Sequence, residues 1–169
     1  MKKYRVSIKG PLTTPIGNGY KSINVSIRQK LDLFACVRPI RYFPGTNSPM
    51  VESNLTDMIV FRENTEDLYT GIEWEPNSEG AKKIIEFIKN ELGDSPFRFE
   101  DECGIGIKPV SREGSERLIT MAIEFALNEK KEILTIVHKG NIMKYTEGAF
   151  RDWGYDLVKN KYDGTVNDN

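Results

Sequence analysis

Hydrophobic and polar positions along the chain follow two alternating patterns. Short apolar runs closed by a charged residue or a turn are typical of strands buried on both faces of a sheet, and they cover residues 33–37, 58–61 and 133–137. Elsewhere apolar residues recur every three or four positions, which predicts amphipathic helices. We expect these helices after Ser22, over residues 81–92, after Ser111 and over residues 150–158, with Ser22 and Ser111 as caps. In the helix after Ser111, we expect Leu118, Met121, Ala122 and Phe125 to face inward. Buried strands that alternate with amphipathic helices indicate an α/β sheet.

The pattern changes between Asp67 and Ser111. Residues 97–100 and 103–109 alternate in polarity or are broken by glycine, which is typical of exposed antiparallel strands. The helix in this part should end at Gly93. We therefore expect a separate lobe here. Near the start of the chain, residues 6–9 should form a strand that leads into a loop over 10–19, so the sequence is expected to begin in mid-fold.

Charge and composition exclude several classes of protein. The 24 Lys and Arg residues against 25 Asp and Glu leave a net charge of -1, which argues against a nucleic-acid binder. No run approaches the roughly 20 apolar residues that cross a bilayer, and no signal-type segment opens the chain. We expect a cytoplasmic protein without a membrane partner. Cys36 and Cys103 are interpreted as small buried side chains rather than as a disulfide or a zinc site.

Cationic residues close the apolar runs. Arg38, Arg62 and Lys139 follow three of them, and ligands of open α/β sheets bind at the carboxyl ends of the strands. If these ends lie together they form a cationic pocket, to which the helix after Ser22 adds its N-terminal dipole. Several guanidinium groups with a hydroxyl suit a small polycarboxylate better than a single phosphate. The alternative, that each arginine only caps a strand and pairs with a surface glutamate, stays open.

Other polar residues are weaker candidates. Asn24 and Arg28 are four positions apart, and so share a face of the first helix. Tyr69 follows an acidic turn and could exchange a proton beside a lysine, although it could equally pack a hairpin. His138, the single histidine, has no partner at metal-ligand spacing and is interpreted as structural.

Four stretches are specific enough to identify a family. They read KGPLTTP (residues 9–15), SINVSIR (22–28), FRENTEDLY (61–69) and VHKGNIMKYTEGAF (137–150). In this order and spacing they closely resemble bacterial NADP-dependent isocitrate dehydrogenase, of the isocitrate/isopropylmalate dehydrogenase family. The resemblance implies that family's α/β fold with an inserted α+β clasp lobe. Residues 1–33 would belong to the large domain, 34–66 and 112–169 to an incomplete small domain, and 67–111 to the clasp-like dimerisation lobe.

The resemblance also implies a role for each candidate residue. Tyr69 would protonate the enol carbon, and Lys139 would assist deprotonation of the substrate hydroxyl. Lys139 and Asn141 would serve the partner's site in a homodimer, and Thr13 and Asn141 would lie near the nicotinamide. The isocitrate-binding set would be Ser22, Asn24, Arg28, Arg38 and Arg62. Ser22 also matches a serine that some bacteria phosphorylate to switch the enzyme off, because a phosphate would repel the substrate carboxylate.

The implied reaction belongs to the tricarboxylic acid cycle. Isocitrate is oxidised and decarboxylated to 2-oxoglutarate and carbon dioxide while NADP is reduced, with Mg²⁺ or Mn²⁺ as the metal. Family members are more than twice as long, and we find neither the metal-binding aspartates nor the NADP-selecting loop here, so no metal ligand is assigned to this chain. We expect a partial, inactive piece of the enzyme. Two alternatives are a piece of a homoisocitrate or 3-isopropylmalate dehydrogenase, and a non-catalytic clasp-type dimerisation module.

Overall fold

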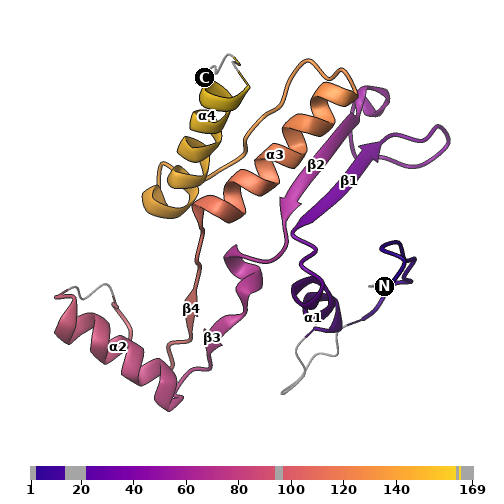
Figure 1. The fold of residues 1–169 in the computed structure, drawn as a ribbon. Coiled ribbons are helices and arrows are strands. Elements are labelled where there is room, and N and C mark those ends of the chain that lie inside the picture. Colours follow the sequence, from indigo (N-terminus) through magenta and orange to yellow (C-terminus); the bar gives the residue numbers. More distant parts are fainter. Residues whose placement is uncertain (1–2, 14–21, 94–96, 163, 165–169) are drawn as a thin grey trace. The chain divides into compact units, whose positions relative to one another are not determined.

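The computed structural model describes residues 3–13, 22–93, 97–162 and 164, and the chain divides into two compact units. Unit 1 takes in residues 1–66 and 110–169, and unit 2 takes in residues 67–109. The elements of unit 1 are α1 (Ile23–Lys30), β1 (Ala35–Arg41), β2 (Asp57–Glu63), α3 (Arg112–Asn128) and α4 (Ala149–Lys161) (Figure 1). Those of unit 2 are β3 (Ile72–Trp74), α2 (Glu79–Glu91) and β4 (Ile105–Ile107). Short 3-10 helices cover Ser53–Leu55 and Asp67–Thr70, and a π-helical turn covers Lys144–Gly148.

The sheet of unit 1 is an antiparallel pair, with β1 and β2 in register from Ala35 opposite Glu63 to Arg41 opposite Asp57. Just beyond the two ends, Tyr42 N–H donates to the Thr56 carbonyl (3.1 Å) and Asn64 N–H to the Phe34 carbonyl (2.9 Å). Hydrogen-bonded and non-bonded pairs alternate along such a ladder. The even-numbered residues of β2 therefore exchange hydrogen bonds with β1. The N–H and C=O groups of the odd-numbered residues point away from β1, toward the other edge of β2.

Proline within β1 fits this alternation. Pro39 stands opposite Ile59, which is a non-hydrogen-bonded pair by the parity of the ladder. Its missing N–H therefore costs no hydrogen bond between the strands, although proline is excluded from most positions of a sheet.

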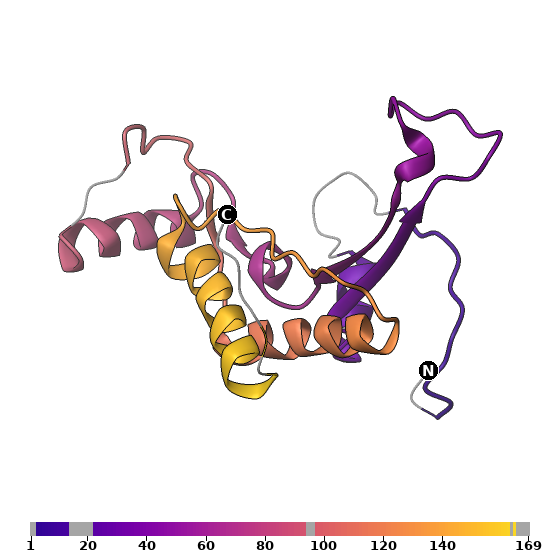
Figure 2. The ribbon, with the colours of Figure 1, turned by 90° about the horizontal axis from the view of Figure 1, so that it is seen from above.

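The core of unit 1 lies where α3 covers one face of β2. The ring of Phe61 on β2 packs against that of Phe125 on α3, with centroids 5.4 Å apart. The most buried apolar side chains described in unit 1 come from α3 as well: Leu118, Ile119, Ala122 and Ile123. Helix α4 packs against α3 and crosses it at an angle (Figure 2). Gly154 permits this approach, because a Cβ atom there would lie 2.8 Å from Ile119 Cδ1.

Unit 2 is built from one helix and a second antiparallel strand pair, β3 with β4. Ser78 caps α2, since its Oγ accepts a hydrogen bond from Ala81 N–H at 3.2 Å. Gly80 in the first turn leaves room for the indole of Trp74, which a Cβ atom would overlap. Gly93 follows the helix with φ +72°, a left-handed conformation that suits glycine. This confirms the predicted end of α2.

The helices of unit 1 begin near the positions that the sequence predicts. Ser22 is the N-cap of α1, and Ser111 Oγ caps α3 by accepting a hydrogen bond from Gly114 N–H at 3.0 Å. The apolar stripe of α3 was predicted less accurately. Met121, expected inside, is 39% exposed, whereas the buried Ile119 and Ile123 were not predicted.

Three strand predictions are wrong. Residues 6–9, 97–100 and 133–137 form no strand, and Val6 and Val137 are 80% and 85% exposed. The reason is that a strand needs a hydrogen-bonded neighbour, and among the described residues only the pairs β1–β2 and β3–β4 form sheets. Burial on both faces is wrong for β1 and β2 too, because Ile40, Met58 and Val60 are exposed on their outer face. Residues 14–19 of the predicted loop lie outside the described residues.

The expectations for the two cysteines and for a membrane-spanning segment can also be compared with the structure. Cys36 and Cys103 are free thiols, half-buried rather than buried. Over the described ranges, no helix is both long enough and apolar enough to cross a membrane.

Candidate functional site

Two of the predicted arginines lie on one face of the β1–β2 pair. Arg62 stands opposite Cys36, and opposed residues point to the same side of a sheet. Arg38 is two residues beyond Cys36 and so shares that side. Such diagonal neighbours are about 7 to 8 Å apart, within reach of long side chains. One small anion can therefore contact both guanidinium groups.

The reason for this closeness differs from the prediction. We expected the carboxyl ends of parallel strands to gather at one sheet edge, but β1 and β2 run antiparallel, so their carboxyl ends lie at opposite ends of the pair. Arg38 is in the middle of β1 rather than at its end, opposite Val60. It is the register of the antiparallel pair that brings Arg38 and Arg62 to the same face.

Arg38 is exposed, and only one of its guanidinium N–H groups has a hydrogen-bond partner among the described residues. Its Nε donates to Cys36 Sγ at 3.3 Å, and a thiol sulfur is a weak acceptor that leaves the remaining guanidinium N–H groups for a ligand. In the described part of the chain, no carboxylate forms a salt bridge with Arg38. The alternative that Arg38 merely pairs with a surface glutamate is therefore not what the structure shows.

Arg62 is oriented by a residue that the sequence analysis missed. Its Nη2 donates to Asn64 Oδ1 at 3.4 Å, and Asn64 is only 4% exposed. The Asn64 Nδ2 group donates in turn to the Leu33 carbonyl at 3.3 Å. Buried amides are normally fully hydrogen-bonded. The available signal for such a role was an asparagine three residues beyond the apolar run of residues 58–61.

Helix α1 joins the same network through its carboxyl end. The Arg28 carbonyl accepts a hydrogen bond from Leu33 N–H at 2.8 Å, and Leu33 is also the residue that Asn64 holds. The half-buried Arg28 is therefore connected to Arg62 by way of Leu33 and Asn64.

The amino end of α1 supports a neighbouring segment. The Ser22 carbonyl accepts the Ser26 N–H at 2.9 Å, but the Ser22 side chain makes no capping hydrogen bond, so its predicted role as a side-chain cap is wrong. Asn24 Nδ2 donates to the Leu12 carbonyl at 3.3 Å. This bond holds the segment of Thr13 against α1, and Thr13 itself is exposed.

Lys139 and Asn141 lie on an exposed turn before the π-helical turn. Lys139 N–H donates to Glu147 Oε2 at 3.1 Å. Gly140 between them is buried, and a Cβ atom on it would come within 2.8 Å of Gly148 Cα. The turn thus needs glycine at this position, and it leaves the side chains of Lys139 and Asn141 exposed.

Tyr69 belongs to unit 2. It is half-buried in the 3-10 helix Asp67–Thr70, which an ion pair between Lys108 Nζ and Asp67 Oδ1 (3.2 Å) ties to the end of β4. Tyr69 is therefore not one of the residues of unit 1 that lie around Arg38 and Arg62.

The donor set for a metal ion is missing from the described residues, where no three or more His, Cys, Asp or Glu side chains gather at a possible metal site. Mg²⁺ and Mn²⁺ prefer carboxylate oxygens. The residues described here do not fit such an ion, and the site that they do form is cationic.

Comparison with known proteins identifies the family of the chain. The model of the family described as isocitrate/isopropylmalate dehydrogenase matches residues 1–167. A protein of Psychrobacter sp. named isocitrate dehydrogenase [NADP] 1 is 56% identical over 96% of this chain, which covers 39% of that relative. Isocitrate dehydrogenase [NADP] of Helicobacter pylori is 55% identical, over 98% of this chain and 39% of its own length.

A solved structure resembles the chain as well. The crystal structure of isocitrate dehydrogenase from Methylococcus capsulatus superposes with a TM-score of 0.75 and 37% identity, over 96% of this chain and 41% of that one. The chain thus matches its relatives along nearly its whole length, while it spans only 39% of the length of those from Psychrobacter and Helicobacter. It belongs to the isocitrate/isopropylmalate dehydrogenase family.

Proposed function

We propose that this chain is the substrate-binding portion of an NADP-dependent isocitrate dehydrogenase. Two relatives that are 55% and 56% identical carry that name, and the family model matches residues 1–167. The observation that carries the proposal is the placement of Arg38 and Arg62 on one face of the antiparallel pair. Guanidinium groups bind carboxylates through two parallel hydrogen bonds, so two arginines together suit a tricarboxylate.

The other members of the proposed isocitrate set lie on helix α1 or at its start. Ser22 and Asn24 lie at its amino end and Arg28 in its last turn. The helix dipole favours a carboxylate beside the first turn, and Ser22 is the N-cap residue of that turn. Asn24 steadies the adjoining segment through the Leu12 carbonyl, which supports a role for Thr13 next to the cofactor.

The proposed reaction is the oxidation of the isocitrate 2-hydroxyl followed by loss of carbon dioxide. When bound, NADP⁺ would supply the hydride acceptor for the hydroxyl carbon. Lys139 helps to remove the hydroxyl proton, the β-carboxylate leaves as carbon dioxide with its bond electrons retained by the enolate, and Tyr69 returns a proton to the enol carbon to give 2-oxoglutarate. We derive no step through a divalent metal from this chain, since the described residues hold no carboxylate cluster.

The finer assignments belong to the same proposal. The enzyme would be a cytoplasmic homodimer in which Lys139 and Asn141 serve the partner's site, a role that suits their exposed turn. Residues 67–111 would be the clasp-like lobe, and the division of the chain at residues 67–109 supports this. Phosphorylation of Ser22 would repel the substrate carboxylate. The metal of the complete site would be Mg²⁺ or Mn²⁺.

Titration of isocitrate into the ¹⁵N-labelled chain tests the anion site. We expect weak binding, with amide shifts confined to α1 and to the residues around Arg38 and Arg62. The affinity should drop about tenfold in Arg38→Met or Arg62→Met, as for one lost charge-assisted contact. Arg41→Met is the matched control, because Arg41 lies in the same strand but points to the opposite face. Equal losses in all three variants, or shifts spread over the whole surface, would contradict the proposal.

Two further measurements separate the alternatives. Binding of 3-isopropylmalate in preference to isocitrate would favour the sister dehydrogenases. Sedimentation that shows a stable dimer, together with no isocitrate binding, would favour the dimerisation module. We expect no turnover of isocitrate with NADP and Mg²⁺ by the 169-residue chain, and turnover would contradict its being a partial site.

A further inference from the structure

Arg117 of α3 joins the two chain segments that meet at the Arg62 end of the β1–β2 pair. Its Nη1 donates to both carboxylate oxygens of Asp32, at 3.0 and 3.1 Å, and its Nη2 donates to Thr65 Oγ1 at 2.8 Å. Asp32 precedes β1 and Thr65 follows β2. The guanidinium carbon also lies 4.6 Å from the centre of the Phe34 ring, in a cation–π contact. One side chain therefore contacts both segments.

The Thr65 hydroxyl connects Arg117 to the turn that follows β2. It accepts the hydrogen bond from Arg117 Nη2 and donates one to Glu63 Oε1 at 2.7 Å. Glu63 Oε1 also accepts the N–H groups of Thr65 (2.7 Å) and Glu66 (3.2 Å). The Glu63 carboxylate thus closes the turn over residues 63–66, and Arg117 holds the hydroxyl inside it.

Asn64 lies in this turn and orients Arg62. Its Oδ1 accepts a hydrogen bond from Arg62 Nη2 at 3.4 Å, and its N–H donates to the carbonyl of Phe34 at 2.9 Å. The ring of that same Phe34 contacts Arg117. A shift of the turn would therefore move Asn64 and the guanidinium group of Arg62 together. Paired hydrogen bonds from a guanidinium group to a carboxylate need a defined geometry, so such a shift would weaken anion binding.

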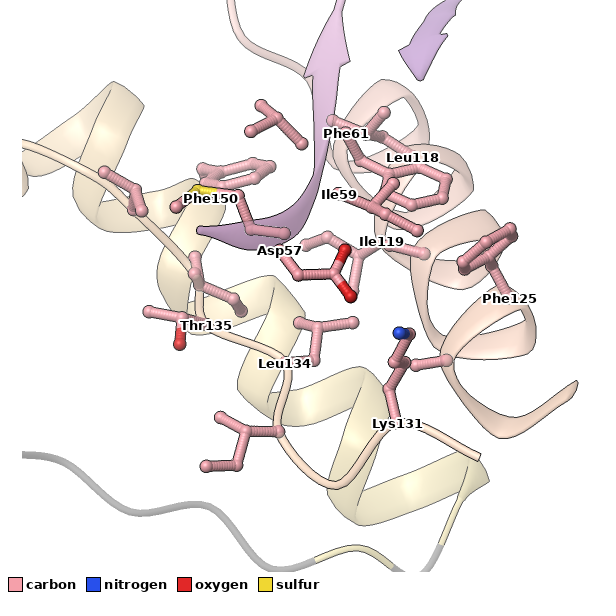
Figure 3. Close-up of a pocket in the computed structure, with 17 residues that line it drawn as sticks. Asp57, Ile59, Phe61, Leu118, Ile119, Phe125, Lys131, Leu134, Thr135 and Phe150 are labelled. Carbon is pink, nitrogen blue, oxygen red and sulfur yellow. The ribbon is translucent and has the colours of Figure 1, made fainter. Parts of the chain in front are cut away.

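Helix α3 is a fixed base for Arg117. The next residue, Leu118, is 5% exposed and lines a pocket together with Phe61 of β2 (Figure 3). The Phe61 ring also packs against Phe125, one to two turns further along α3. This apolar packing fixes α3 against β2, and so it fixes the start of the Arg117 side chain relative to Arg62.

Arg117 acts on Arg62 from the other face of the sheet. Successive residues of a strand point to opposite faces, so Arg62 points away from the face on which Phe61 packs against α3. An anion held by Arg62 would therefore lie on the face opposite to α3. The route from Arg117 to that anion runs through the turn over residues 63–66.

Stability alone does not explain an arginine at this position. The Nε atom of Arg117 is buried and has no hydrogen-bond partner among the described residues, and a buried donor without a partner is unfavourable. The side chain of Asp32 is 67% exposed, so its ion pair adds little. What arginine supplies here is a planar fork that reaches two acceptors at once, which neither lysine nor an apolar side chain can do.

We propose that Arg117 is a positioning residue for substrate binding, which fixes the turn over residues 63–66 and, through it, the guanidinium group of Arg62. This inference rests on the proposed function, since isocitrate is the anion that Arg62 would hold.

A neutral substitution tests the proposal by titration of isocitrate into the ¹⁵N-labelled chain. Thr65→Val keeps the shape of the side chain but removes its hydroxyl, and it should lower the affinity about fivefold. Thr65→Ser is the matched control, because it keeps the hydroxyl, and it should bind within about twofold of the unchanged chain. Neither change alters a charge, so a loss in Thr65→Val cannot come from weaker electrostatic attraction.

Substitution of Arg117 itself should have the same effect. Arg117→Met should lower the affinity about fivefold. Arg112→Met removes an equal charge from the same helix, but Arg112 pairs with Glu116 and Asp156, so this control should bind within about twofold of the unchanged chain. In an Arg62→Met background, Arg117→Met should cause no further loss, because its effect acts through Arg62. A purely structural role would leave the two losses additive.

Hydrogen exchange measures the turn without isocitrate. In Arg117→Met, the amides of Thr65 and Glu66 should exchange at least about tenfold faster, relative to the amide of Val60. Val60 lies within the β1–β2 ladder and reports the overall stability of the sheet.

Three results with isocitrate would overturn the proposal: equal affinity in Thr65→Val and Thr65→Ser, an equal loss in Arg112→Met and Arg117→Met, or the full loss from Arg117→Met in the Arg62→Met background. If the unchanged chain binds no isocitrate, the proposed function fails, and hydrogen exchange then decides the role of Arg117. Equal acceleration at Thr65 and Val60 would overturn that role. If Arg117→Met does not fold, the two Thr65 variants carry the same test.

Discussion

Glu66 holds the start of α3 from outside the helix. Its Oε2 accepts a hydrogen bond from Ser111 N–H at 2.9 Å, and its Oε1 accepts one from Ser111 Oγ at 2.6 Å. A carboxylate at this end also interacts favourably with the helix dipole. Gly114, one turn into the helix, lies directly beneath the carboxylate, since a Cβ atom there would be 2.6 Å from Glu66 Oε2.

This geometry predicts that substitutions of Glu66 and Gly114 are strongly coupled. Glu66→Ala should lower the free energy of unfolding by about 2 kcal/mol, for two charge-assisted hydrogen bonds on a half-buried group. Gly114→Ala gains up to about 1 kcal/mol of helix propensity but displaces the carboxylate, so the single variant should lose about 1 kcal/mol. With Glu66 already replaced by alanine, the same Gly114→Ala change should stabilise the chain.

Urea denaturation followed by circular dichroism measures the four free energies of this cycle. The expected coupling is about 2 kcal/mol, well above the roughly 0.5 kcal/mol within which independent sites add. Glu66→Gln is the control for charge, because it keeps the shape and one acceptor, and it should lose about half as much as Glu66→Ala. Additive effects, or stabilisation by Gly114→Ala in both backgrounds, would refute the reasoning.

Three other substitutions test separate features of unit 1. Arg117→Met removes the ion pair of Arg117 Nη1 with Asp32 Oδ1 (3.0 Å). Because the pair is partly exposed, its loss should lower the free energy of unfolding by only about 1 kcal/mol, measured by urea titration. Gly140→Ala places a Cβ 2.8 Å from Gly148 Cα and should cost about 2 kcal/mol or more, seen as a melting temperature several degrees lower. Burial raises the pKa of the Tyr162 phenol above its ordinary value of 10.0, so that its contribution to stability is present below pH 10 and is lost as the pH rises through the folded pKa. Tyr162→Phe should therefore make the melting temperature fall less steeply above about pH 10 than it does in the unchanged chain.

Helices were predictable from this sequence because their signals are local. An apolar stripe at helical spacing, a serine before it and a glycine after it all act within a few residues. Ser111 and Gly93 accordingly mark real helix boundaries. The error at Met121 also has a simple cause, since spacing defines a stripe but not which edge of the stripe turns toward the sheet.

Strands were less predictable, because pairing depends on residues far apart in the sequence. The apolar runs of β1 and residues 133–137 look alike, yet only β1 has a partner strand among the described residues. The runs carry no information on strand direction either, and so the antiparallel pairing was missed. Asn64 was missed for a related reason, since its importance comes from the Leu33 carbonyl, which the folded chain alone brings close.

The arginine pair therefore depends on the register of β1 against β2. A slip by one residue would move every side chain of one strand to the other face, and Arg38 and Arg62 would then point to opposite sides of the sheet. Asn64 opposes such a slip, because its N–H and its side chain bind the adjacent Phe34 and Leu33 carbonyls. Asn64→Ala should thus weaken isocitrate binding without removing a cationic group, whereas Arg62→Met removes the group and leaves the register in place. Amide shifts along the whole of β1 in Asn64→Ala, but only near the site in Arg62→Met, would distinguish loss of register from loss of charge.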